Sequence, residues 1–157
     1  MGDRIESIYW DAVIIEEKLG AFLAWLGDEK PPAYTHTWDK EILEEYNYWR
    51  TTLRKLLVDS KPIADQLPEV MDEMFMDKKI VGYWYEGTTA FLRDFAQYIE
   101  GDCELRNDAG EATKISFEDG RALYSFESRT WSDYKTDDEA FNDLPELPET
   151  EKVIRGL

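Results

Sequence analysis

The chain has 157 residues, which favours one domain able to bury about 70% of its unfolded surface. Hydrophobic residues at 43% and aromatic residues at 14% supply enough core material to exclude global disorder. Asp and Glu total 35 against 18 Lys and Arg, so the formal net charge is −17. Such a chain repels nucleic acid and anionic membranes, and it attracts basic protein surfaces.

The N-terminal segment, residues 1–77, shows the apolar spacing of helices. Its first apolar side chains recur at alternating steps of three and four residues, which places them on one stripe of a helix. The stripe consists of Ile5, Ile8, Ala12, Ile15, Leu19, Phe22 and Leu26. This spacing predicts a long helix over residues 5–26.

Two more helices are predicted before residue 78. Apolar residues at helical spacing over 39–59 favour a second long helix, for which Thr37 or Asp39 can act as the N-cap. Its acidic residues come early and its basic residues late, which is the order that the helix dipole prefers. A third helical region is predicted over 60–77, interrupted or restarted at Pro68. The N-terminal half is therefore expected to be helical.

Residues 79–130 combine strand and helix patterns. Short alternating or β-branched runs, separated by turn residues such as those of 107–110, predict strands. The expected strands are residues 80–85, 102–106, 112–117 and 122–128. Helical spacing over 88–100 predicts one crossover helix, which Gly101 and Asp102 are expected to end.

The tail, residues 131–157, is strongly acidic. Pro148, followed by good helix-forming residues and by Gly156, predicts a short final helix. The whole chain is thus expected to form a single α+β domain over residues 1–157. In this fold the helical N-terminal half packs on a four-stranded, mostly antiparallel sheet with one crossover helix, and the acidic tail forms a C-terminal extension.

Two residues invite a catalytic interpretation, and both have a simpler structural one. His36 is the only histidine, and no Ser or Cys lies near it in the sequence, so a surface or capping role is favoured. Cys103 falls at a position of a predicted strand that is typical of a buried hydrophobe. The chain has neither the Cys/His spacing of a metal site nor a glycine-rich phosphate loop. We therefore predict a protein that is not an enzyme and has no cofactor or metal.

The acidic clusters support a more specific hypothesis, because large aromatic residues are interleaved with them. Carboxylates combined with a few aromatic anchors can occupy the nucleic-acid-binding groove of a basic protein. The sequence therefore predicts a non-catalytic inhibitor that binds a basic partner, such as a nuclease, in the manner of a phage-encoded nucleic-acid mimic. The expected partner-binding residues are Asp133, Asp137, Asp138 and Glu139 with Trp131 and Tyr134 in the tail, and Asp39, Glu41, Glu44 and Glu45 at the start of the second helix.

Other functions are compatible with the same residues. An immunity protein or antitoxin that neutralises a nuclease toxin needs a similar acidic surface. A small enzyme could use two carboxylates that the fold brings together. The simplest alternative is that the charge serves solubility alone. A single cysteine and the lack of any run near ~20 apolar residues predict a cytoplasmic protein, with its oligomeric state left open.

Overall fold

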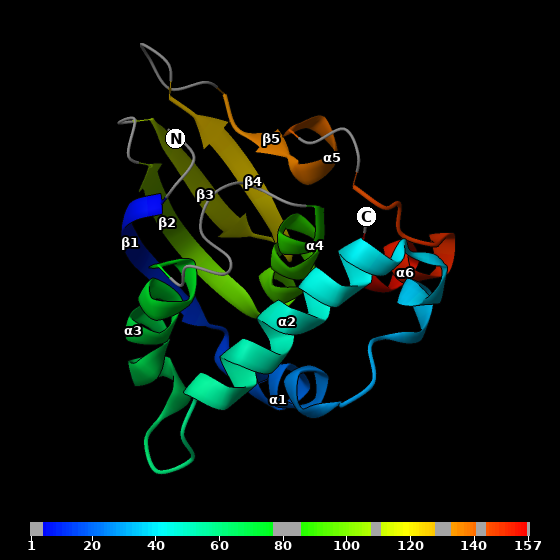
Figure 1. The fold of residues 1–157 in the computed structure, drawn as a ribbon, viewed down its shortest axis with the longest axis horizontal. Helices are drawn as coiled ribbons and strands as arrows, with labels where there is room; N and C mark the ends of the chain where they lie inside the picture. Colours follow the sequence, from blue (N-terminus) through cyan, green and yellow to red (C-terminus); the bar gives the residue numbers. More distant parts are fainter. Residues whose placement is uncertain (1–4, 77–85, 108–110, 128–132, 141–143, 157) are drawn as a thin grey trace.

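The computed structural model describes residues 5–76, 86–107, 111–127, 133–140 and 144–156. Within these ranges helices pack on a sheet of five strands, which confirms the α+β class (Figure 1). The strands are β1 (Ile5–Ile14), β2 (Ile99–Asn107), β3 (Ala112–Glu118), β4 (Arg121–Phe126) and β5 (Lys135–Thr136). The α-helices are α1 (Leu19–Gly27), α2 (Lys40–Leu56), α3 (Ile63–Met76), α4 (Glu86–Phe95), α5 (Asp137–Ala140) and α6 (Glu149–Arg155). The short 3-10 helices are η1 (Glu16–Lys18), η2 (Ala33–Thr37) and η3 (Ala96–Tyr98).

The first element corrects the prediction of a single helix over 5–26. β1 occupies the first part of this range, and only its last part forms η1 and α1. Trp10, Ala12 and Ile14 are buried, whereas the residues between them are exposed. The segment contains both a helical spacing and a period of two, and pairing with β2 selects the period of two. The N-terminal half is therefore not purely helical.

The sheet is antiparallel throughout and follows chain order, from β1 at one edge to β5 at the other. The predicted strands over 102–106, 112–117 and 122–128 are confirmed as β2, β3 and β4. β1 and β5 were not predicted, and with them the described sheet has five strands rather than the four expected. The predicted strand over 80–85 lies outside the described residues. Gly101 does not end a helix; it lies inside β2, opposite Ala12 and Phe117.

The other helical predictions agree better with the structure. The helix expected over 39–59 is α2, with Asp39 at its N-cap position. α3 runs through Pro68 without a break, so the interruption expected there is absent. The helix expected over 88–100 corresponds to α4 and η3. The final helix begins directly after Pro148, as predicted.

The central element is α4, which lies between α2 and the sheet (Figure 1). Every residue from Gly87 to Ala96 is buried. Aromatic side chains join α4 to α2 and to the sheet. Phe91 stacks on Trp49 of α2 with 5.2 Å between the ring centroids, and Phe95 stacks on Trp10 of β1 with 6.3 Å between the centroids. A helix that is buried on all sides has no solvent-facing side for its polar residues, so each of them needs a partner inside the protein.

Gly101 gives a direct test of the β1–β2 pairing. A Cβ atom added there would lie 2.4 Å from the carbonyl oxygen of Asp11, and the residue has a φ of +122°. Backbone strain and overlap act together, so we expect Gly101→Ala to lower the free energy of unfolding by about 3 kcal/mol or more in urea unfolding. Gly20→Ala is the control, because the added Cβ has no atom within 4 Å, and Ala in a helix should stabilise by about 0.5–1 kcal/mol. A Gly101→Ala protein as stable as the wild type would contradict the described pairing.

Candidate functional site

The carboxylate of Asp94 on α4 is 1% exposed and accepts hydrogen bonds from three side chains. Tyr34 of η2 and Tyr46 of α2 both donate their hydroxyl hydrogen to Oδ2 of Asp94. Arg155 of α6 donates from Nη2 to Oδ1 at 2.5 Å. The two carboxylate oxygens therefore connect α4 to three other elements. Tyr46 in turn accepts a hydrogen bond of 3.0 Å from Nε1 of Trp25 on α1.

Within this network the negative charge of the carboxylate is compensated by Arg155 and by the two tyrosine hydroxyl groups. Burial raises the pKa of Tyr34 and Tyr46 far above the ordinary tyrosine value, and the charge of Asp94 raises both further. Burial lowers the pKa of Arg155, but the charge of Asp94, the influence of Tyr34 and the hydrogen bonds to Asp94 and Glu151 together outweigh burial, and the net shift is upward. Both oxygens of Asp94 accept hydrogen bonds from groups that stay protonated at neutral pH. We interpret the network as a structural tie rather than as an acid–base site.

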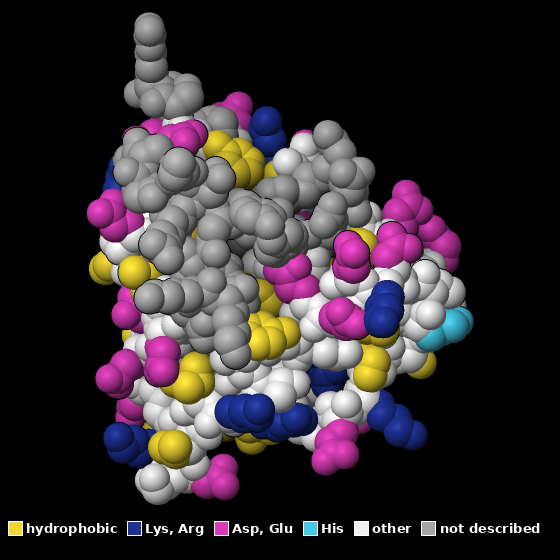
Figure 2. Space-filling model, in the orientation of Figure 1, with side chains coloured by type: hydrophobic (Ala, Val, Ile, Leu, Met, Phe, Trp, Pro, Cys, Tyr) yellow, Lys and Arg dark blue, Asp and Glu magenta, His cyan; other side chains and the backbone are white. Residues whose placement is uncertain are grey.

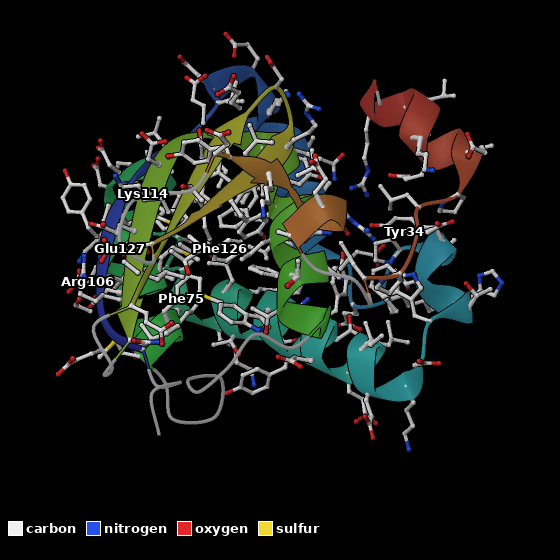
Figure 3. The ribbon with its side chains drawn as sticks, turned by 90° about the horizontal axis from the view of Figure 1, so that it is seen from above. Tyr34, Phe75, Arg106, Lys114, Phe126 and Glu127 are labelled. Atoms are coloured by element: carbon white, nitrogen blue, oxygen red, sulfur yellow. The ribbon has the colours of Figure 1, made fainter. Side chains whose placement is uncertain are left out.

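A different kind of surface lies on the side of the sheet that faces away from α4. Figure 3 shows Arg106 and Lys114 on this outer side, and Phe75 and Phe126 on the side toward the helices. The register places Tyr9 opposite Glu104, Asp11 opposite Asp102 and Val13 opposite Glu100, with all six side chains on the outer side. We call these six residues the acidic sheet face.

Of the four carboxylates on the acidic sheet face, one lies near basic side chains and three do not. Glu104 lies 3.7 Å from Arg106 and opposite Lys114. Asp11, Glu100 and Asp102 are exposed, and among the described residues no Lys, Arg or His lies within ion-pair distance of them. Three carboxylates thus lie side by side on two adjacent strands without a cationic partner.

Exposed apolar and aromatic side chains border these carboxylates. Tyr9 is 65% exposed and Val13 is 51% exposed. Tyr134 is 48% exposed next to β5, at the edge of the sheet opposite β1, and its pKa is raised by partial burial and by the charges of Asp102 and Glu104. The arrangement can supply both charge and apolar contact to a partner, which is the combination found in protein interfaces.

The tail residues predicted to bind a partner do not form one cluster. Asp133, Tyr134 and Glu139 are exposed. Asp137 is half-buried and lines a pocket with Arg93 of α4. Trp131 lies outside the described residues, as does the side chain of Asp138.

The predicted set at the start of α2 is also divided. Asp39, Glu41 and Glu44 are exposed. Glu45 is half-buried, and its Oε1 accepts a hydrogen bond of 2.5 Å from Thr88 on α4. Glu45 therefore contacts another helix, whereas Glu44 has an ion pair with Lys40 within α2.

Sequence reasoning missed the strand carboxylates, Asp11, Glu100 and Asp102. The signal that could have found them is the period of two in 8–14, which puts Asp11 and the residues two positions away on one side of a strand. The prediction of a helix over 5–26 left this period of two unused. The meeting of Asp11 with Asp102 depends on the register between two strands far apart in sequence, and periodicity within one segment cannot show that.

His36 and Cys103, the two residues considered for catalysis, lie on the surface and in the core, respectively. His36 is exposed at the end of η2, with Nδ1 2.7 Å from the carbonyl oxygen of Ala33. Cys103 is buried on β2, and burial raises the pKa of its thiol well above the ordinary value. Across the described ranges, no group of three His, Cys, Asp or Glu side chains is placed to hold a metal ion. No helix in the same ranges has the length and apolar character needed to cross a membrane.

The fold and this site define an α+β protein whose antiparallel sheet is covered by helices on one side and acidic on the other. No known protein family, curated protein or solved structure matches the chain.

The tyrosines of the Asp94 network predict how stability depends on pH. Their folded-state pKa values are raised, so their contribution is complete below about pH 10, where unfolded tyrosine begins to ionise, and is lost as the pH rises toward the folded values. Each such tyrosine steepens the alkaline loss of stability by about 1.4 kcal/mol per pH unit. Urea unfolding of Tyr34→Phe above about pH 10 should therefore show a shallower fall of the unfolding free energy with pH, by about the 1.4 kcal/mol per pH unit that corresponds to one proton.

Ile115→Val is the matched control for that measurement. Ile115 is fully buried and does not titrate, so its truncation should lower stability by about 0.5–1.5 kcal/mol without changing the slope. An unchanged slope in Tyr34→Phe would mean that Tyr34 is not held in its protonated form by the fold.

Proposed function

We propose that the protein is a non-catalytic inhibitor that binds the basic, nucleic-acid-binding surface of another protein through its acidic sheet face. One observation carries this proposal: Asp11 and Asp102 are directly opposite each other on neighbouring strands, and both are exposed. Like charges in this position are unfavourable by roughly 0.2–1 kcal/mol. Folding gains nothing from the pair, whereas a cationic partner would convert the repulsion into attraction.

The position of the pair in the sheet supports this function over solubility. Solubility requires net charge, and it does not require carboxylates to face each other. Figure 2 shows acidic side chains spread over the helical side of the molecule with Lys and Arg among them. The acidic sheet face instead combines three carboxylates, which have no ion-pair partner in the described part of the chain, with the exposed side chains of Tyr9 and Val13. Tyrosine is among the residues that contribute most to binding energy at interfaces.

The partner we propose is an Arg- or Lys-rich protein, such as a nuclease, in the cytoplasm. A reducing compartment suits a chain whose single cysteine is free and buried. A phage-type anti-defence protein and an immunity protein or antitoxin would use the same surface, and the identity of the bound protein distinguishes them. Direct binding of nucleic acid is not expected at a surface of this charge.

The test compares the wild type with an Asp11→Asn/Asp102→Asn double variant as baits for proteins of the native host. The double variant should be equally stable or more stable by up to about 1 kcal/mol, because the repulsion is removed. It should nevertheless lose the partner, or bind it with a slower association rate and a weaker dependence on salt. Tyr9→Ala should instead speed dissociation while leaving the salt dependence nearly unchanged.

A charge-matched control separates the site from the net charge. Glu69→Gln/Glu73→Gln also removes two exposed carboxylates, on α3, which packs on the other side of the sheet from the acidic sheet face. This control should retain wild-type binding. Equal binding by both double variants would refute the sheet face as the interface, and equal loss in both would show that net charge alone attracts the partner.

A further inference from the structure

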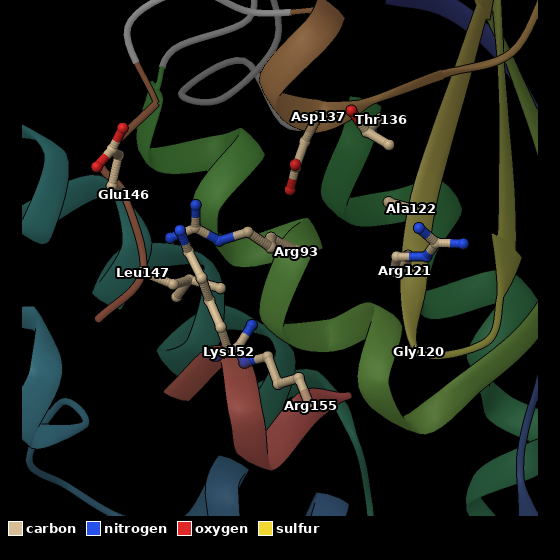
Figure 4. A pocket seen from close by; sticks show the side chains of 10 residues that line it. All are labelled: Arg93, Gly120, Arg121, Ala122, Thr136, Asp137, Glu146, Leu147, Lys152 and Arg155. Carbon is tan, nitrogen blue, oxygen red and sulfur yellow. The ribbon is translucent and has the colours of Figure 1, made fainter. Parts of the chain in front are cut away.

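The two edges of the described sheet differ in how they are protected. At one edge β5 is two residues long and α5 begins directly after it, and Figure 4 shows Thr136 and Asp137 at this point beside β4. At the other edge β1 is ten residues long. Proteins usually guard an exposed edge with a short strand, a proline, a charged side chain such as lysine, or a bulge. β1 has neither proline nor lysine, its bulge lies between Ile5 and Ser7, and its register is regular from Ser7 to Ile14.

The outer edge of β1 carries backbone groups that β2 does not use. The residues of an antiparallel strand point their amide and carbonyl groups alternately to either side, so about half of these groups in β1 face away from β2. Among the described residues, no backbone hydrogen bond joins residues 5–14 to any segment other than β2. One acceptor is used within the strand, because Nε1 of Trp10 donates to the carbonyl oxygen of Ala12 at 2.9 Å. Figure 1 shows β1 at the left margin of the sheet, where a further strand would have to pair.

The side chains next to this edge select the kind of strand that fits. Tyr9, Asp11 and Val13 lie on the outer side of β1 and are exposed. A residue directly opposite on an added strand would have its Cβ atom about 4.5–5.5 Å away. Lys or Arg opposite Asp11 would form an attractive pair, to which Asp102 on β2 adds its negative charge. Apolar side chains two positions to either side would cover Tyr9 and Val13.

The same charges disfavour a second copy of the chain at this edge. β1 contains two exposed acidic residues, Glu6 and Asp11, and no Lys or Arg. Pairing of two β1 strands would bring like charges together, between chains that each carry a net charge of −17. The carboxylates therefore oppose self-association, and they leave the edge attractive to a basic strand.

We propose that the partner adds a basic, extended segment to the sheet as a sixth strand beside β1. In this segment Lys or Arg lies opposite Asp11, and apolar residues lie two positions before and after it. The inference rests on the proposed function, because the acidic sheet face supplies the side-chain contacts, and it adds the backbone of β1 to the interface. In complexes formed by strand addition, main-chain hydrogen bonds give affinity and alternate side chains give specificity.

The probe is a capped peptide, Lys-Val-Thr-Arg-Thr-Val-Lys, which reads the same in both directions and places Val, Arg and Val on one side of a strand. Amide hydrogen exchange of the full chain, followed by nuclear magnetic resonance, reports the edge directly. In the free chain alternate amides of residues 7–13 should exchange fast, and saturating peptide should slow them by about tenfold or more. The proposal is overturned if all these amides are protected in the free chain, or if the peptide leaves the fast ones unchanged.

An ester analogue of the peptide separates backbone pairing from attraction between charges. Ester linkages in place of the central amides remove N–H donors and keep every side chain and charge. The analogue should bind more weakly by about tenfold or more. Equal affinity of the two peptides would overturn strand addition and leave attraction by the acidic sheet face intact. Equal affinity of the wild type and Asp11→Asn/Asp102→Asn for the amide peptide would instead overturn the basic character of the segment and count against the proposed function.

Ser7→Lys tests the edge on the protein itself. Ser7 is exposed on β1 and lies outside the acidic sheet face, and a lysine there should repel a basic strand. This variant should weaken binding of the amide peptide by about tenfold. Ala33→Lys adds the same charge at an exposed position of η2, the light-blue segment at the right of Figure 1, and should leave the affinity unchanged. Equal weakening in both variants would show that net charge alone attracts the peptide, and would overturn the proposal.

Discussion

The buried carboxylate of Asp94 is the constraint on which the arrangement of the helical layer depends. It lies on a helix that is buried on all sides, and it receives hydrogen bonds from η2, α2 and α6. Removing one partner of such a group leaves a buried charge uncompensated, which typically costs 3–5 kcal/mol, about as much as truncating a large core side chain. The tail is therefore attached to the protein through Arg155 and through the buried Leu144 and Leu147.

Local sequence patterns predicted much of this fold, and pairing between distant segments decided the rest. The turns after β2 and β3 and the alternation of Ile115 with Phe117 were sufficient to predict the central strands. β1 was missed because its apolar residues satisfy a helical period as well as a period of two, and the unpaired edge of β2 resolves the ambiguity only after folding. The presence of a strand at the N-terminus places the helices α1 to α4 in the connection between two neighbouring strands.

The sites were less predictable than the fold for the same reason. Acidity and exposed aromatic residues could be read from composition, but the strand register alone brings Asp11 to Asp102. The helical spacing of α4 assigned Phe91 and Phe95 to the core, and it could not show that Arg93 and Asp94 are buried with them. Asp94 is paired with Arg155, whereas Arg93 has no ion-pair partner among the described residues and donates a hydrogen bond to the carbonyl oxygen of Pro145; both contacts depend on where the tail returns to α4. The tail was expected to be a surface for partners, and it also contributes to the interior.

Hydrogen–deuterium exchange of an Asp94→Asn variant tests the role of the carboxylate most directly. The amides of Lys152 and Gly156 in α6 and of Thr35 and Trp38 around η2 donate within these short helices. If the charge of Asp94 holds both segments in place, these amides should lose protection together, while those between β2 and β3 stay protected. Wild-type protection in α6 and η2 of the variant would contradict the account, because it would show that these segments pack without the buried charge.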